Sequence, residues 1–242
     1  RSSLYALPSN VSASTSGTIA VHHEPVVANE DAPYATDVVR RWPYYLSKIY
    51  QEQTALRLGE ELGLEVVVVN PSLLLGPGDD RGSSTADVEK VVRGKLPIIP
   101  RGGGVAFVDA RDAALGCVLA MNKGVAGERY LLNGENVTLQ SFMGRVARLA
   151  GVATPRAVVE PSTLKWAGRL AGAIYRRFDV EPPVDAHSVE MAEHYWYCSS
   201  EKARNQLGFV PRDPRKTLMD TVRDVQRRHN LLPDTVSAAP NA

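Results

Sequence analysis

A tyrosine and a lysine stand four residues apart at Tyr44 and Lys48, and a run of hydroxyl side chains (Ser-Thr-Ser) lies upstream at 14–16. Pro43 suits the first turn of a helix, so the pair should share one helical face, with the ammonium near the phenol oxygen. Bringing a phenol from its usual pKa of ~10 to ~7 requires about 4 kcal/mol, and a cation ~5 Å away at an effective dielectric of ~20 supplies about 3 kcal/mol. The spacing therefore predicts a proton-transfer site, in which a neighbouring hydroxyl would hold the same substrate oxygen.

Taken alone, the Y-x-x-x-K spacing is weak evidence, because it also arises by chance. With 9 Tyr and 7 Lys in 242 residues, about a quarter of a match is expected at random. An exposed helix with an incidental tyrosine and lysine would explain the pair at least as well. The surroundings favour chemistry: hydroxyls precede the pair, and Asn-Pro-Ser at 70–72 follows it at the carboxyl end of a predicted buried strand, where open parallel sheets bind ligands.

The elements around the pair alternate between helix and strand. Residues 44–62 carry apolar side chains at helical spacing, and residues 65–70 form a β-branched run that is typical of a strand buried on both faces. Further strands are expected at 105–108 and 129–132, and helices at 85–93, 110–121, 139–150, 164–178, 188–194, 200–207 and 214–229. The pattern predicts an α/β sheet domain with a smaller, largely helical second lobe.

Five motifs follow one another along the chain. They are Ser-Thr-Ser-Gly-Thr at 14–18, Tyr44-x-x-x-Lys48, Asn-Pro-Ser-x-x-x-Gly-Pro-Gly at 70–78, Phe-Val-Asp-Ala-Arg-Asp at 107–112 and Lys-Ala-Arg-x-x-Leu-Gly-Phe-x-Pro at 202–211. Over residues 11–229 the chain therefore resembles the short-chain dehydrogenase/reductase superfamily, in the extended branch of nucleotide-sugar epimerases, dihydroflavonol reductases and hydroxysteroid dehydrogenases. The resemblance implies an NAD(P)-dependent oxidoreductase or epimerase that acts on a hydroxyl or carbonyl of a small molecule, such as a sugar nucleotide, a flavonoid-like or a sterol-like compound.

In that family a tyrosine is the general acid/base, a lysine lowers its pKa and binds the nicotinamide ribose, and a serine polarises the substrate oxygen. Tyr44 and Lys48 match the first two roles. The hydroxyl stays open: alignment in the epimerase manner selects Ser16, alignment on the following Gly-Thr, as in the dihydroflavonol reductases, selects Thr15, and of the two we favour Ser16. The resemblance also places three residues beside the nicotinamide of NAD or NADP: Asn70, Pro71 and Ser72.

The family fold implies a partial Rossmann-type parallel sheet with a smaller, mainly helical C-terminal substrate lobe. We expect residues 1–75 and 105–136 to form the C-terminal part of the Rossmann-type domain. Residues 76–104 and 137–230 should form the substrate-binding lobe, and residues 231–242 a disordered tail.

One element of that family has no counterpart in the chain. Neither G-x-G-x-x-G nor G-x-x-G-x-x-G occurs, and the glycines at 102–104 precede a predicted strand instead of opening a helix after one. We therefore expect a truncated protein, which binds a dinucleotide poorly unless another chain supplies the N-terminal half. A misassigned start or a degenerate homologue would explain the same departure. A non-catalytic binding or regulatory homologue that has lost cofactor binding is the alternative function.

The composition is that of an ordinary globular protein without a strong charge. Lys plus Arg (28) nearly balance Asp plus Glu (27), which gives no electrostatic case for nucleic acid or an anionic membrane as a partner. No apolar run approaches the ~20 residues that span a bilayer, and we expect a cytoplasmic location with Cys117 and Cys198 as structural thiols. No metal site is expected, since the adjacent histidines at 22–23 would point apart in a strand. Family members commonly dimerise through the helix that carries the tyrosine and lysine, so a homodimer through residues 44–62 is a further expectation.

Overall fold

The computed structural model describes residues 10–96, 98–154, 157–160 and 190–231 of the chain. Its elements follow in this order: β1 (Asn10–Ala13), the 3-10 helix η1 (Ser16–Thr18), α1 (Thr36–Val39), α2 (Pro43–Leu62), β2 (Val66–Pro71), β3 (Leu73–Leu75), α3 (Ala86–Val92), β4 (Ile98–Pro100), β5 (Gly104–Asp109), α4 (Ala110–Lys123), β6 (Arg129–Leu132), β7 (Glu135–Thr138), α5 (Leu139–Ala150), β8 (Ala157–Val159), the π-helical turn η2 (Ala203–Leu207) and α8 (Pro214–Arg228). The predicted helix at 164–178 and almost all of the predicted tail lie outside the described residues.

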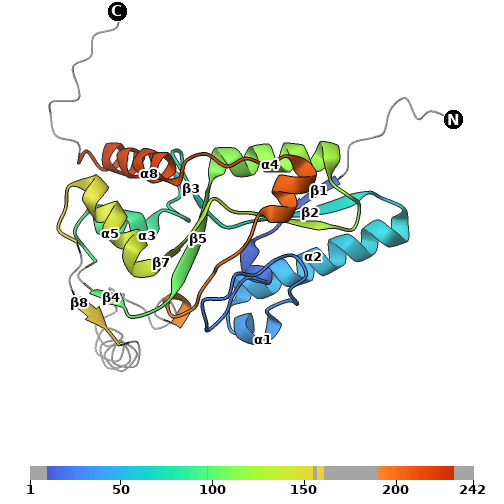
Figure 1. Ribbon diagram of the computed structural model, residues 1–242, viewed down its shortest axis with the longest axis horizontal. Helices are drawn as coiled ribbons and strands as arrows, with labels where there is room; N and C mark the ends of the chain where they lie inside the picture. The colour runs from blue at the N-terminus through green and yellow to red at the C-terminus, as the bar shows by residue number, and fades with distance from the viewer. Residues whose placement is uncertain (1–9, 97, 155–156, 161–189, 232–242) are drawn as a thin grey trace, which may run out of the picture.

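The first sheet holds three parallel strands in the order β1-β2-β6, with β2 in the middle. Helices α2 and α4 lie on its two faces (Figure 1). The three valines of β2 at 67–69 are completely buried, as expected for a strand between two helical layers. Because β1 and β2 pair in register up to Ala13 and Val69, their carboxyl ends lie side by side. The hydroxyl motif at 14–18 and the Asn-Pro-Ser motif therefore meet at one edge of the sheet.

A second sheet continues the first, with its strands in the order β3-β5-β7. Ser72 alone separates β2 from β3, so one extended segment runs from the first sheet into the second. β3 is parallel to β5, whereas β5 and β7 are antiparallel. The strand predicted at 105–108 thus pairs with β3 and β7, and not with the strand predicted at 129–132. The sequence did not predict β7, because residues 135–138 contain no β-branched run like that of β2.

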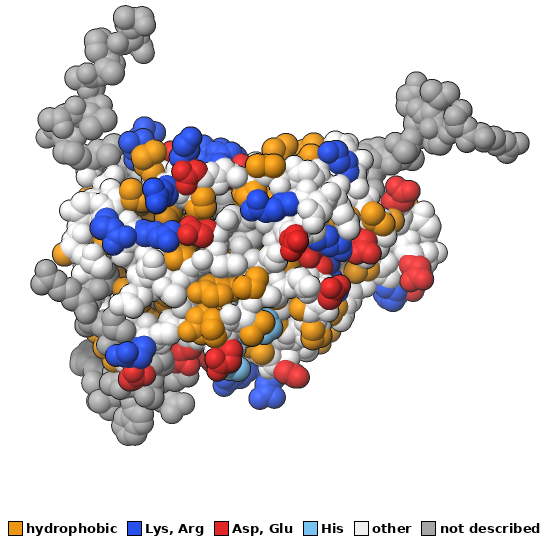
Figure 2. Space-filling model, viewed as in Figure 1, with side chains coloured by type: hydrophobic (Ala, Val, Ile, Leu, Met, Phe, Trp, Pro, Cys, Tyr) orange, Lys and Arg blue, Asp and Glu red, His pale blue; other side chains and the backbone are white. Residues whose placement is uncertain are grey.

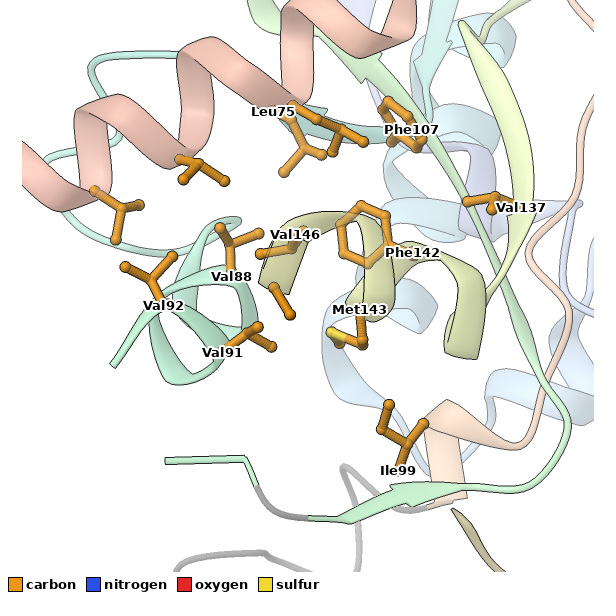
Figure 3. Close-up of a cluster of buried hydrophobic side chains, with 14 residues drawn as sticks. Leu75, Val88, Val91, Val92, Ile99, Phe107, Val137, Phe142, Met143 and Val146 are labelled. Atoms are coloured by element: carbon orange, nitrogen blue, oxygen red, sulfur yellow. The ribbon is translucent and has the colours of Figure 1, made fainter. Parts of the chain in front are cut away.

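Helices α3, α5 and α8 pack beside the second sheet around an apolar core (Figure 3). The rings of Phe107 in β5 and Phe142 in α5 lie 5.7 Å apart between their centroids within this core. α5 begins after the cap Thr138, whose hydroxyl accepts a backbone N–H at 3.2 Å, and α8 begins after the cap Asp213, whose carboxylate accepts one at 2.9 Å. The predicted α/β class, with a Rossmann-type parallel sheet and a mainly helical lobe, is confirmed.

The described part of the chain has neither a membrane-spanning helix nor a metal-binding cluster, and its two thiols are free. None of its helices combines the length and apolarity that crossing a bilayer requires. No group of three or more His, Cys, Asp or Glu side chains in those residues is placed to hold a metal ion. Cys117 and Cys198 are both free thiols, the first half-buried and the second fully buried.

Candidate active site

Tyr44 and Lys48 occupy consecutive turns at the start of α2, which Pro43 opens as predicted. The Lys48 ammonium donates to the carbonyl oxygen of Ala13 at 3.3 Å and to Oε1 of Gln51 at 2.9 Å. The lysine is thus held against the carboxyl end of β1. Tyr44 is 58% exposed, so its phenol is accessible to a ligand.

The hydroxyl turn, residues 14–18, follows β1 directly and contains η1. Thr15 is extended, with φ −150° and ψ 148°, and its Oγ1 accepts the N–H of Gly17 at 3.3 Å. Thr15 is partly exposed, whereas Ser16 is buried. The O–H of Thr15 has no acceptor within the described ranges, so it is available to donate.

The Ser16 hydroxyl is turned into the protein, where it hydrogen-bonds the thiol of Cys198. Burial raises the pKa of Cys198 to about 12, and the hydrogen bond with Ser16 opposes that rise. Cys198 also belongs to an apolar cluster that includes Ile19 and Leu131. Ser16 therefore ties the hydroxyl turn to the C-terminal segment.

Adjacent tyrosines at the start of α2 have different environments. Burial raises the pKa of Tyr45 to about 12, with the neighbouring Tyr44 as a second cause, so Tyr45 stays protonated. Its ring packs against Trp196 at 4.9 Å between centroids. A Cβ on Gly17 would lie 2.4 Å from the Tyr45 ring, so only glycine allows the hydroxyl turn to approach α2 this closely. Tyr45 is a packing residue, and Tyr44 is the tyrosine open to chemistry.

The Asn-Pro-Ser segment at 70–72 directs its polar side chains inward. The Nδ2 of Asn70 lies 3.1 Å from the carbonyl oxygen of Thr15 and 3.1 Å from the hydroxyl oxygen of Thr18. Ser72 donates to the side-chain oxygen of Asn133 at 3.0 Å. Pro71 is half-buried. The two polar side chains are therefore engaged within the protein, and Asn70 fastens β2 to the hydroxyl turn.

Sequence reasoning missed Glu52, which is completely buried two turns after Tyr44. Its Oε1 accepts hydrogen bonds from the Ser14 hydroxyl and from Nδ2 of Asn70, the latter at 2.7 Å. Its Oε2 is buried without a hydrogen-bond partner among the described residues, and such an unpaired acceptor costs about 1–3 kcal/mol. Burial raises the pKa of Tyr34, and the nearby Glu52 carboxylate raises it further. The available signal was the spacing: positions 44, 48 and 52 repeat every four residues on one helical face.

The site fits the nicotinamide end of a dinucleotide better than its pyrophosphate end. An ammonium has three N–H donors, and Lys48 uses two of them at Ala13 and Gln51, which leaves one for a ribose hydroxyl. The glycines at 102–104 cradle no phosphate, because Gly104 accepts the N–H of Trp196 at 3.0 Å and donates to the carbonyl of His194 at 3.1 Å. We find no glycine-rich pyrophosphate seat in the described ranges.

A hollow of about 510 Å³ lies elsewhere, between α5 and α8. It is lined by three arginines, two carboxylates and three other residues: Arg145, Arg148, Arg215, Glu135, Asp213, Leu149, Pro214 and Leu218. Figure 2 shows positively charged side chains gathered over these two helices, and apolar side chains nearer the centre of the same face. None of the predicted site residues lines this hollow.

Known proteins place the chain in a family. The model of the NAD dependent epimerase/dehydratase family matches residues 5–132, which include the hydroxyl turn, Tyr44, Lys48 and residues 70–72. A protein of Synechocystis sp. that carries the provisional name dihydroflavonol 4-reductase is 30% identical over 187 residues, 74% of this chain and 53% of that protein. Sterol demethylase protein B of Methylococcus capsulatus is 32% identical over 164 residues, 66% of this chain and 49% of that protein.

Solved structures give the same result for the fold. The crystal structure of gox2253 matches with a TM-score of 0.75 at 30% sequence identity. The match covers 92% of this chain and 67% of the gox2253 chain. A nucleoside-diphosphate-sugar epimerase from Pseudomonas aeruginosa has a TM-score of 0.73 at 21% identity, with 92% and 68% covered, and supports the fold alone. The chain spans about half the length of the curated relatives it matches. With more than half of its residues matched by the family model, the chain belongs to the NAD dependent epimerase/dehydratase family.

Proposed function

We propose that the protein is an NAD(P)-dependent oxidoreductase or epimerase in which Tyr44 exchanges a proton with a hydroxyl or carbonyl oxygen of a small molecule. One observation carries the proposal: an exposed tyrosine stands one helical turn from a lysine whose ammonium is fixed on Ala13, where the hydroxyl turn begins. A phenol placed beside a held cation can give up and regain a proton at a substrate oxygen. Bound NAD or NADP would supply the hydride.

Within this proposal each residue has its own task. Tyr44 donates or accepts the proton at the substrate oxygen. Lys48 stabilises charge on the phenol and offers its third N–H to the nicotinamide ribose. Asn70, Pro71 and Ser72 would line the nicotinamide side of the site, and the side chains of Asn70 and Ser72 already bind other protein groups.

The sequence alone favours Ser16 as the substrate-polarising hydroxyl. We assign this role to Thr15 instead. Ser16 is 5% exposed and its hydroxyl is engaged with Cys198, whereas Thr15 is partly exposed and has a free O–H within the described residues. A donor must reach the substrate oxygen in the transition state to stabilise charge there. Burial therefore supports Thr15 for that role and a structural role for Ser16.

Replacing the two hydroxyls separately tests this assignment. Thr15→Val should lower kcat by about 10²-fold, because the variant keeps the shape and loses one donor to the developing charge. Thr15→Ser should restore most of the rate. Ser16→Ala should leave kcat within a few-fold and lower the free energy of unfolding by about 1 kcal/mol. Steady-state rates and urea denaturation measure both effects, and a larger rate loss in Ser16→Ala than in Thr15→Val would return the role to Ser16.

The substrate we propose is a flavonoid-like or sterol-like compound, with a sugar nucleotide as the further candidate. Curated relatives carry the names of a dihydroflavonol reductase and a sterol demethylase protein. A homodimer through α2 is a further proposal, supported by the exposed side chains of Tyr50 and Leu62 on this helix.

Cofactor titration separates the enzyme from a non-catalytic homologue. The 242-residue chain should bind NADH and NADPH only weakly, at about millimolar Kd by fluorescence, because its sequence contains no glycine-rich dinucleotide-binding motif. Submicromolar binding by this chain would overturn that expectation. Reading the coding sequence upstream of Arg1 shows whether an in-frame glycine-rich segment precedes it, and so whether a longer protein is the one to test. If that protein binds dinucleotide tightly but turns over no carbonyl or alcohol, the non-catalytic function is favoured.

A further inference from the structure

We infer that Glu52 is a positioning residue, which orients the Asn70 amide and through it holds the hydroxyl turn in place beside Tyr44. This inference rests on the proposed function for its catalytic consequence. Its structural part concerns only the contacts between α2, β2 and the hydroxyl turn. Glu52 itself is completely buried and touches no substrate.

The contacts of Glu52 join three elements at one point. Its Oε1 accepts from Ser14 at the end of β1 and from Asn70 at the end of β2, and its own backbone belongs to α2. The same face of α2 carries Lys48, which donates to Ala13. Helix α2 therefore contacts the carboxyl ends of both β1 and β2, through Lys48 and Glu52.

An acceptor-only group determines which way an amide faces. A carboxylate has no proton to donate, so Asn70 must present its NH₂ to Glu52, at 2.7 Å. The same NH₂ then reaches two oxygens of the hydroxyl turn, the carbonyl of Thr15 and the hydroxyl of Thr18. The Oδ1 of Asn70 is left buried without a partner in the described residues. If the amide were reversed, its oxygen would face three oxygens. The Glu52 carboxylate and the Thr15 carbonyl can only accept, so together they enforce the observed orientation, and Glu52 makes the shorter contact.

The orientation matters because it holds the backbone of Thr15. Thr18 also donates to the Thr15 carbonyl, from its hydroxyl at 3.0 Å and from its backbone N–H at 3.2 Å, so that carbonyl accepts three hydrogen bonds. Held in this way, Thr15 is extended and its side chain remains partly exposed. Without the acceptor at position 52, the Asn70 amide would be held less firmly, and its hydrogen bonds to Thr15 and Thr18 would weaken. A buried carboxylate with an unpaired oxygen thus has a use at the site.

Amide hydrogen exchange, measured without cofactor or substrate, tests the structural part directly. The readout is the exchange rate of the Gly17 and Thr18 amides divided by that of Val68, an amide of β2 that donates to Glu128. In Glu52→Met, which keeps length but removes the acceptor, this ratio should rise at least about tenfold. Glu52→Gln restores an acceptor and should bring the ratio back to within about threefold of the wild type.

A matched control separates positioning from general loss of stability. Ile49→Ala removes a buried side chain from the same helix without touching the polar network, and should raise all three exchange rates while leaving their ratio unchanged. Asn70→Ala removes the mediator, so it should reproduce the Glu52→Met ratio, and the double variant should add little. If Glu52→Met does not fold, the exchange ratio of Asn70→Ala still tests the inference. Equal ratios in Glu52→Met and Ile49→Ala, or in Asn70→Ala and the wild type, would overturn the inference.

The catalytic consequence is tested separately. In a protein that turns over substrate and includes this chain, Glu52→Met should lower kcat about 10- to 100-fold and leave the dinucleotide Kd unchanged, with Glu52→Gln close to the wild type. If the exchange ratio rises but no variant or wild type turns over substrate, the proposed function has failed and the positioning of the turn stands. If turnover is present and Glu52→Met leaves kcat unchanged, the positioning has no role in the reaction.

Discussion

Tyr44→Phe should lower kcat by about 10³-fold in a protein that turns over its substrate, because the substitution removes only the hydroxyl group through which the phenol exchanges a proton. The ring remains, so the fold and the dinucleotide Kd should not change. Steady-state kinetics give the rate, and fluorescence titration of NADPH and NADH gives the affinity. The same substitution should leave the free energy of unfolding within about 0.5 kcal/mol of the wild type, since Tyr44 is 58% exposed.

Two other tyrosines of α2 are matched controls for this substitution. Tyr50 is also 58% exposed, but it lies six residues further along the helix and so on a different face. Tyr50→Phe should leave kcat unchanged. Tyr45→Phe removes a hydroxyl from a buried ring and should affect stability more than rate. If Tyr44→Phe keeps more than a tenth of the wild-type kcat, Tyr44 is not the proton donor and the proposed mechanism is wrong.

The sequence predicted those parts of the site that depend on neighbours along the chain. Helix α2 follows from Pro43, from its apolar spacing and from Gly63, and the placement of Tyr44 and Lys48 follows from the helical repeat. Strand β2 follows from its run of valines. Each of these features is local, so periodicity and flanking residues were enough to find it.

The remaining features depend on contacts between distant segments, which periodicity does not report. Ser16 is buried and its hydroxyl meets Cys198, and no residue near position 16 in the sequence indicates that contact. The antiparallel partner of β5 depends likewise on how β7 returns. Glu52 read as an ordinary charged position on a helix, although charged residues are seldom fully buried unless paired. Its role became visible only when β1 and β2 were placed beside it.

The role of the glycine run at 102–104 also depends on contacts with a distant segment. The sequence established that this run does not have the spacing of a dinucleotide-binding turn, but not what it does. Its backbone pairs with the segment at 192–196, which bears Trp196, the ring that packs on Tyr45. The run therefore connects the C-terminal segment to the aromatic cluster beside the hydroxyl turn, and packing there leaves no room for a side chain at Gly103 or Gly104.

Gly103→Ala should be strongly destabilising, because two effects act at the same residue. The φ angle of Gly103 is +69°, in the left-handed region, where an alanine costs about 1–2 kcal/mol. A Cβ there would also lie 1.9 Å from the carbonyl oxygen of Ala192, which belongs to backbone and cannot move aside as a side chain would. Displacing that segment adds about 1–3 kcal/mol of overpacking, and the hydrogen bond from Leu139 to the Gly103 carbonyl would weaken with it. We expect a total loss of about 2–5 kcal/mol in the free energy of unfolding.

Gly102→Ala measures the backbone strain alone, so the difference between the two variants gives the packing contribution. Gly102 has a φ of +85°, but the nearest atom to its Cβ would be the Tyr195 hydroxyl at 3.9 Å, in ordinary van der Waals contact. Gly102→Ala should therefore cost only the about 1–2 kcal/mol of left-handed strain. Urea denaturation of both variants measures the difference, and near-UV circular dichroism should show the Trp196 environment altered in Gly103→Ala alone. Equal losses in the two variants would mean that the segment at 192–196 yields to a methyl group, and that it does not hold the aromatic cluster in place.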